Sequence, residues 1–378
     1  MFRLDVLPAQ RGDSLWLTYG EGDERHHVLV DAGPQETIPT LVPELEERIK
    51  ALPGRRSRVE LFVITHIDAD HIQGAVSLLS DHRRVELFRD VWFNGFRHLG
   101  LLGGPDGERL TAALAAHADR WNHAFDGDAV AVPDEGSLPV VTLRGGMKIT
   151  VLGPTHEALA KLAPEWEKAC RKAGIVPGEG AAIAKKSWQR DELLGTFEPE
   201  LLAEAPFRPD RGAPNGSSIS LIAEHGGQRV LLLGDAHAKT TAAGLDRLGP
   251  GPHTFAAVKL SHHGSRGNTS LDLLSRIRSK RWIVSTNGAQ FGHPDSECLA
   301  RVVVTQRRPT FHLNYVTDRV SDLIDGAGDD YRVALPKRAR NGTFAEGVSL
   351  ELGGAADPAW PVRMGGGVPL VGSDPGFA

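Results

Sequence analysis

Four residues that can bind a metal ion lie within six positions of the segment THIDADHIQG, residues 65–74. Imidazole nitrogens and carboxylate oxygens are ligands for zinc, manganese and iron, and the alternating spacing allows them to divide between two ions. Without a cation, neighbouring carboxylates would repel one another and resist burial. The segment therefore predicts a site for one or two divalent metal ions, Zn or Mn, rather than a solvated polar loop, with these ligands: His66, Asp68, Asp70 and His71.

The elements around this cluster predict where it lies in the fold. The preceding run VELFVIT is continuous and rich in β-formers, as expected of a strand buried on both faces. After the cluster, Ile72, Val76 and Leu79 recur at helical spacing. We therefore expect the cluster on a strand-to-helix loop, where the sites of α/β proteins usually lie.

Two further apolar segments end in residues that bind metals. RVLLLGDAH places Asp235 at a strand tip, where one carboxylate can bridge two ions. AAVKLSHHGS ends in His262 and His263, and the sequence leaves open which of the two is the ligand. The same arrangement of apolar strand and terminal ligand thus occurs three times.

Composition excludes several classes of protein. The chain has 378 residues, 40% hydrophobic and 24% charged, which is enough for one large or two ordinary domains with a real core. A net charge of -5 provides no global basic field for nucleic acid. Cys170 and Cys298 are far apart and not in a Cys-x-x-Cys pair, which argues against a disulfide framework and a thiolate zinc site. No apolar run approaches the roughly 20 residues of a membrane span, so we expect a cytoplasmic protein without membrane contact.

The rest of the chain divides into two strand-rich runs around an irregular middle. Interleaved helices in both runs predict two packed sheets with helices outside. Strands are expected at 2–7, 14–19, 27–31, 59–65, 87–92, 139–152, 218–224, 229–234, 256–261 and 281–286, and helices near 108–121, 238–247 and 270–278.

Two segments interrupt this pattern. Residues 154–213 begin with helical sequence and continue with Gly, Pro and charged residues, so we interpret them as an insertion or lid, with a plain surface loop as the alternative. Residues 353–378 form a Gly/Pro-rich tail. The expected organisation is one domain at residues 1–352, followed by that tail.

The order of the segments LVDAG, THIDADHIQG, NGSSISL, LLLGDAH, VKLSHHGS and FGHP resembles the metallo-β-lactamase fold superfamily. Within it, the pattern is similar to the hydrolase domain of the ComEC/Rec2 competence proteins and their soluble relatives, over most of residues 1–350 apart from 154–213. The resemblance implies an α/β fold, a four-layered αββα sandwich with metal ions at one edge of the two sheets. It also implies a metal-activated water that attacks a phosphodiester, ester or amide.

The resemblance also assigns roles to individual residues. It makes Asp31 a supporting aspartate for the metal loop, and Asp235 the bridging carboxylate. Asp68 stands where the superfamily more often has His, and Asn215 lies in a motif that often supplies another His. These two departures add oxygen to the ligand shell, which weakens a preference for zinc and favours manganese.

Other residues are predicted to serve the reaction itself. Asp70 is the natural group to orient or deprotonate the attacking water, although as a metal ligand it would be a poor base. His293, with Asn287, is predicted to protonate a leaving oxygen or to hold a phosphate, and a scaffold role for His293 is the alternative. Ser265, in the turn after the two histidines, is predicted to contact substrate.

The leading functional hypothesis is a phosphodiesterase or nuclease with nucleic acid as substrate. The alternative is a hydrolase of a small ester, lactone or cyclic nucleotide, and a third reading is a binding module with an inactive site. Because a free nuclease is hazardous in the cytosol, the insertion is also predicted to hold the site closed until a regulatory protein or protease releases it.

One motif points elsewhere. Gly12, Asp13, Ser14 and Leu15 spell the nucleophile block of the GDSL esterases. Those enzymes need a later Asp-x-x-His to activate the serine, and no such spacing occurs near the C-terminus. We therefore expect Gly-Asp-Ser simply to enter the second strand.

Overall fold

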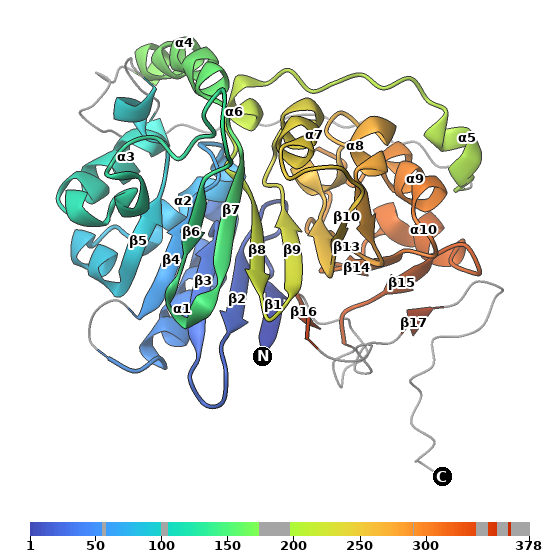
Figure 1. Ribbon diagram of the computed structural model, residues 1–378, viewed down its shortest axis with the longest axis horizontal. Helices are drawn as coiled ribbons and strands as arrows, with labels where there is room; N and C mark the ends of the chain where they lie inside the picture. Colours follow the sequence, from blue (N-terminus) through green and yellow to red (C-terminus); the bar gives the residue numbers. More distant parts are fainter. Residues whose placement is uncertain are drawn as a thin grey trace.

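The structure is a computed structural model that describes residues 1–54, 58–99, 105–173, 197–289, 291–337, 347–353 and 362–363. Two sheets face one another, and helices cover the outer face of each (Figure 1). The predicted α/β fold is thus confirmed as an αββα sandwich.

The first sheet has six strands in the order β16-β1-β2-β3-β4-β5. Strands β1 to β3 are antiparallel neighbours, whereas β3, β4 and β5 run parallel. Every residue of β4 is buried, as its continuous apolar sequence predicts. The bounds are β1 Phe2–Val6, β2 Leu15–Tyr19, β3 His26–Val30, β4 Val59–Val63, β5 Phe88–Trp92 and β16 Val348–Glu351.

The second sheet has nine strands in the order β17-β15-β14-β13-β11-β9-β8-β7-β6. The run β9, β11, β13, β14 and β15 is parallel, so the carboxyl ends of these strands meet at one edge. A separate parallel pair joins β10 to β12. The bounds are β6 Val140–Thr142, β7 Lys148–Gly153, β8 Ser220–His225, β9 Gln228–Leu232, β10 His253–Phe255, β11 Ala257–Lys259, β12 Ile277–Ser279, β13 Arg281–Val284, β14 Thr310–Leu313, β15 Arg332–Ala334 and β17 Val362–Arg363.

Two groups of helices form the outer layers. Helices α1 to α4 pack on the first sheet, and α7 to α10 on the second (Figure 1). The bounds are α1 Ile38–Lys50, α2 Ala69–Leu78, α3 Pro105–Ala115, α4 His156–Ala173, α5 Pro199–Ala203, α6 Ala213–Gly216, α7 Ala238–Asp246, α8 Leu271–Ser275, α9 Ser296–Thr305 and α10 Ser321–Asp325. No helix among the described residues is both long enough and apolar enough to cross a membrane.

The hydrophobic core has two compartments. One fills the space between the sheets and continues under α7 to α10, and the other lies between the first sheet and α1 to α4. Helix α4, at the start of the predicted insertion, buries Leu159, Leu162 and Trp166 in the second compartment. This part of the segment is therefore built into the outer helical layer. Residues 174–196 of the predicted lid lie outside the described residues. Most of the predicted tail, residues 353–378, lies outside them as well.

Candidate metal centre

Three strand ends bring the predicted ligands together. His66 follows β4, and Asp70 and His71 lie in the first turn of α2. Asp235 follows β9, and His262 and His263 follow β11 in a short turn where both have positive φ, 49° and 54°. A positive φ is uncommon for residues other than glycine, so this turn is a costly conformation that directs both rings toward Asp235.

Asp235 lies at the centre of four imidazole rings. Its Oδ1 is 3.4 Å from His71 Nε2 and 3.8 Å from His263 Nε2. Its Oδ2 is 3.7 Å from the Nε2 atoms of both His66 and His262. The two oxygens of one buried carboxylate thus serve two pairs of histidines, which is the arrangement required of a carboxylate that bridges two ions.

The opposite ring nitrogens are held by hydrogen bonds. His71 Nδ1 lies 2.8 Å from Asp31 Oδ2, and His263 Nδ1 lies 2.9 Å from the carbonyl of Ser285. Since only the protonated nitrogen can donate to these acceptors, the lone pair of each neutral ring is on Nε2. Both rings therefore present a metal-binding nitrogen to Asp235.

The outer pair is oriented in the same way. Thr65 Oγ1 donates to Asp31 Oδ2 at 2.8 Å and lies 3.0 Å from His66 Nδ1, so it accepts from that ring. His262 Nδ1 lies 3.1 Å from Asn268 Oδ1. Asp31 thus contacts His71 directly and reaches His66 through Thr65, and its supporting role stays a prediction.

Two further aspartates complete two sets of ligands. Asp70 Oδ2 lies 3.4 Å from His263 Nε2, and Asp68 Oδ2 lies 3.7 Å from His66 Nε2. We define the inner group as Asp70, His71, His263 and Asp235 Oδ1, and the outer group as His66, Asp68, His262 and Asp235 Oδ2.

Unpartnered atoms show that these groups fit a metal ion. The buried Nε2 atoms of His66, His71 and His263, together with Asp235 Oδ1, have no hydrogen-bond partner among the described residues. Buried polar atoms are nearly always satisfied, so such a cluster needs an explanation. A divalent cation between these donors would satisfy all of them, and their nitrogen and oxygen chemistry suits zinc or manganese.

The electrostatics also require positive charge here. Burial alone would lower the pKa of His263, but Asp13 and Asp235 raise it to about 9. Burial would also lower the pKa of His71, but the charges of Asp235 and Asp31 raise it well above its usual range. For Asp70, burial is outweighed by His263 and His71, which lower the pKa to about 2. The carboxylates stay ionised, and either protons or a metal ion must balance them.

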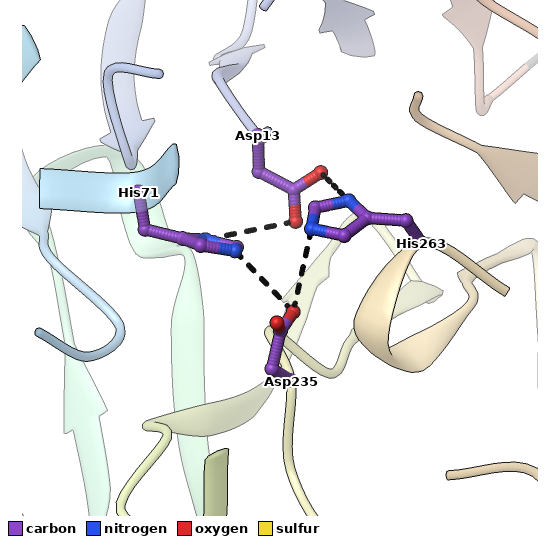
Figure 2. A group of neighbouring side chains, drawn as sticks. All are labelled: Asp13, His71, Asp235 and His263. Carbon is purple, nitrogen blue, oxygen red and sulfur yellow. Dashed lines mark ion pairs between the residues drawn. The ribbon is translucent and has the colours of Figure 1, made fainter. Parts of the chain in front are cut away.

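Asp13 is a site residue that the sequence did not predict. Asp13, His71, Asp235 and His263 each offer one ligand atom, and these atoms all lie within 4.8 Å of one another (Figure 2). Asp13 Oδ1 is 3.4 Å from His263 Nδ1, and Oδ2 is 4.0 Å from His71 Nδ1. A buried ion pair joins Asp13 to Lys259 of β11. A lysine within the apolar run AAVKLS was the available signal, because a buried ammonium needs a carboxylate partner.

Asn215 lies beside the outer group. Its Nδ2 donates to Asp210 Oδ2 at 2.6 Å and lies 3.3 Å from His262 Nδ1. Asp210 also accepts from Asn268 Nδ2 at 3.0 Å. The end of the predicted insertion therefore contributes directly to the surroundings of His262.

The residues predicted to contact substrate lie at different distances from the centre. The His293 ring lies 5.0 Å from the His262 ring, and burial lowers the pKa of His293. Asn287 Nδ2 donates to Gln10 Oε1 at 3.3 Å. Ser265 is buried, and its Oγ accepts from the Gly267 amide at 3.2 Å. The His293 ring borders the outer group, Ser265 contacts it through its amide, which donates to the His262 carbonyl at 2.9 Å, and the roles of all three residues stay predictions.

Comparisons with known proteins agree with the resemblance seen in the motifs. No protein-family model matches the sequence. The chain is 27% identical over 146 residues to ComE operon protein 3 of Bacillus subtilis (strain 168), a match that spans 36% of this chain and 18% of that protein.

Similar solved structures share little sequence with the chain. They include Zn²⁺-bound PqqB from Methylobacterium extorquens, with a TM-score of 0.38, 14% identity and coverage of 93% of this chain and 100% of that one. The metallo-β-lactamase fold protein YhfI from Bacillus subtilis has a TM-score of 0.37, 10% identity and coverage of 83% of this chain and 96% of that one.

Proposed function

We propose that the protein is a metal-dependent hydrolase whose substrate is a phosphodiester of nucleic acid. The observation that carries the proposal is Asp235, whose two buried oxygens face four imidazole nitrogens. The inner and outer groups would hold one divalent ion each. A bound divalent ion lowers the pKa of a water toward neutrality and polarises the oxygen that is attacked.

The side chains of the site would divide the remaining work. Asp70 stays ionised and is held next to His263, so it can orient a water by accepting a hydrogen bond. His293 is neutral near pH 7 because burial lowers its pKa, and it borders the outer group. A neutral imidazole donates a single hydrogen bond, so we assign His293 to holding a substrate oxygen.

An exposed aromatic residue supports a substrate that carries bases. Phe291 is 50% exposed, stacks on the His293 ring with centroids 6.0 Å apart, and lies 6.0 Å from the His262 ring. Bases of single-stranded nucleic acid stack on such side chains, at about 1–3 kcal/mol per base. Arg266 gives less support, since its guanidinium is paired with Glu297 at 2.7 Å.

The decisive experiment is cleavage by metal-stripped protein resupplied with Mn²⁺, Zn²⁺ or Mg²⁺. Plasmid DNA, linear DNA and single-stranded RNA would be compared with a small ester, a lactone and a cyclic nucleotide. We expect metal-dependent cleavage of a nucleic acid that Asp235→Asn abolishes and that Asp246→Asn, a change at an exposed carboxylate on α7, leaves intact. Turnover of only a small substrate would contradict the nuclease assignment.

Replacing Phe291 tests the substrate class separately. Phe291→Ala should weaken binding of a single-stranded oligonucleotide by about 5- to 100-fold, the equivalent of one lost stacking contact. Phe291→Trp should retain it, and Leu271→Ala, at another exposed apolar side chain, should change nothing. Equal binding by wild type and Phe291→Ala, measured by fluorescence anisotropy, would contradict base stacking at this position.

A further inference from the structure

A buried charged pair lies next to the inner group and has no place in the proposed reaction. Asp13 is 1% exposed and Lys259 is fully buried, and their side chains form an ion pair. The Lys259 ammonium also lies 3.5 Å from the carbonyl of Gly234. Burying two charges is costly, and a neutral pair of similar volume is often as stable. Stability alone therefore does not explain why an ammonium lies here.

The position of Asp13 relative to the histidines is informative. Figure 2 shows Asp13 and Asp235 on opposite sides of the His71 and His263 rings. Asp13 faces the Nδ1 atoms, whereas Asp235 faces the Nε2 atoms. A metal ion held through the Nε2 atoms would share them with Asp235, whereas Asp13 lies beside the Nδ1 atoms.

The loop that carries Asp13 is fitted against the metal-binding loop. A Cβ atom at Gly12 would lie 1.8 Å from the backbone oxygen of Asp70, so only glycine allows this approach. The Asp13 amide donates to that same oxygen at 3.3 Å. Ser285, whose carbonyl accepts from His263, donates through Oγ to the Gly12 carbonyl at 3.2 Å. Asp13 is thus placed by contacts with the loops of two inner ligands.

Asp13 is nevertheless close enough to become a ligand itself. One oxygen of Asp13 lies within 4.8 Å of an oxygen of Asp235 and of one ring nitrogen in each of His71 and His263. An unpaired carboxylate this close to a divalent ion would be drawn to it. Among the lysine and arginine side chains of the described residues, Lys259 is the one paired with that carboxylate.

We propose that Lys259 is a built-in cation that holds Asp13 away from the metal ion, so that Asp13 positions the His263 and His71 rings instead of ligating the metal. Outer carboxylates of this kind fix ring orientation and raise the basicity of the ligand. The inference rests on the metal centre of the proposed function and is independent of its substrate.

The test uses Co²⁺ bound to the full chain, because the visible absorption of Co²⁺ changes when a further ligand joins its shell. Lys259→Met removes the ammonium and keeps most of the length of the side chain. It should alter the Co²⁺ spectrum at unchanged stoichiometry, because Asp13 joins the metal. The double variant Asp13→Asn/Lys259→Met should regain the wild-type spectrum, since a neutral amide is not drawn to the ion.

Affinity provides a second readout. Asp13→Asn, alone or with Lys259→Met, should bind Co²⁺ about 10- to 100-fold more weakly than wild type, as expected when an outer carboxylate is lost. Lys239→Met, at an exposed lysine on α7, is the matched control and should match wild type in both readouts. Circular dichroism shows which variants are folded, and the Asp13→Asn variants carry the test if Lys259→Met alone does not fold.

Two results would overturn the proposal. One is a folded Lys259→Met protein with the wild-type spectrum, and the other is a folded Asp13→Asn protein with wild-type affinity for Co²⁺. If Asp13 and Lys259 only stabilised the fold, both variants would give these results. They would then differ from wild type only in a lower unfolding midpoint. Neither readout involves substrate, so a protein that passes both and cleaves no phosphodiester would contradict the proposed function alone.

Discussion

The inner and outer groups of the metal centre share one bridging aspartate but differ in their surroundings. The inner side chains are buried, and the rings of His71 and His263 each have a carboxylate at Nδ1, supplied by Asp31 and Asp13. In the outer group the Asp68 side chain is 41% exposed, and His262 Nδ1 lies 3.1 Å from the amide oxygen of Asn268 and 3.5 Å from Asp210 Oδ2. The inner group is therefore distinguished by its deeper burial and by the short contact of 2.8 Å between Asp31 and His71.

This difference indicates a division of labour. The inner group would retain an ion more firmly, because its ligands are buried and Asp31 contacts His71 directly. The outer group is built for access, since His262 is next to His293 and the exposed Phe291. We therefore expect the inner ion to be the tighter of the two and the outer one to face the substrate.

Removing one ligand from each group should give the largest difference in metal content between the two groups. His71→Ala should lower the hydrolysis rate by at least about 100-fold, since a metal ion contributes several kcal/mol to the reaction, and the protein should retain less than one tight ion. His262→Ala should leave one tight ion in place and weaken the second. Metal analysis after dialysis distinguishes the two, and equal metal content in both variants would contradict the ranking.

Weakening the support of the inner group should have the next largest effect. Asp31→Asn removes the charge behind His71 and keeps a side chain that tolerates the positive φ of 57° at this position. Zinc affinity should fall about 10- to 100-fold in competition with a chromophoric chelator. Asp90→Asn is the control, because that buried carboxylate accepts from Trp92 and the His123 amide, away from the centre. An unchanged affinity in Asp31→Asn would show that the charge is not needed.

The matching change in the outer group should matter less. Asn268→Ala removes one acceptor for His262 Nδ1, and the second zinc ion should bind less than about 10-fold more weakly because the lost partner is neutral and Asp210 Oδ2 still lies 3.5 Å from that nitrogen. Calorimetric titration resolves the second binding event. A larger loss than in Asp31→Asn would reverse the comparison.

His312 is a buried histidine outside the site, and its pKa is shifted by burial and not by neighbouring carboxylates. Burial, with a smaller effect of Arg281, lowers the pKa of His312 to about 3. Below pH 6.5 the unfolded chain binds a proton at this residue and the folded protein does not, so stability falls as pH falls. From pH 7 to pH 5 the loss from this group is about 2 kcal/mol.

The measurement is urea unfolding of wild type and His312→Leu at both pH values. The variant should lose about 2 kcal/mol less than wild type on acidification. His123→Leu, at an exposed histidine, should behave as wild type. An identical acid response of wild type and His312→Leu would show that the His312 ring is accessible to protons in the folded state.

Local sequence predicted much of this architecture, because buried strands and the loops after them carry strong local signals. The strands around the centre were predicted to within a few residues, since LFVI and VLLL are continuous apolar runs. The expected strand at 139–152 was wrong in one respect: it is two antiparallel strands, β6 and β7, joined by a turn at Gly145 and Gly146, both with positive φ. Two adjacent glycines were the overlooked signal.

The contribution of Asp13 could not be derived in the same way. Its role depends on Lys259, nearly 250 positions away in the chain, and on the approach of Gly12 to Asp70. The choice between His262 and His263 also depended on tertiary structure, because the positive-φ turn places both rings against Asp235. Local patterns predict what a strand end carries, but not which distant residue will lie behind it.

The sequence distance between Asp13 and His263 also has a consequence for biosynthesis. The centre needs the first sheet, which supplies His66 and His71, and the second, which supplies Asp235 and both later histidines. On the ribosome, the N-terminal half emerges long before its partner. A nascent chain therefore lacks a complete centre until at least residue 263 has been made and folded, so the centre forms only after ligand-bearing strands of both sheets have been synthesised.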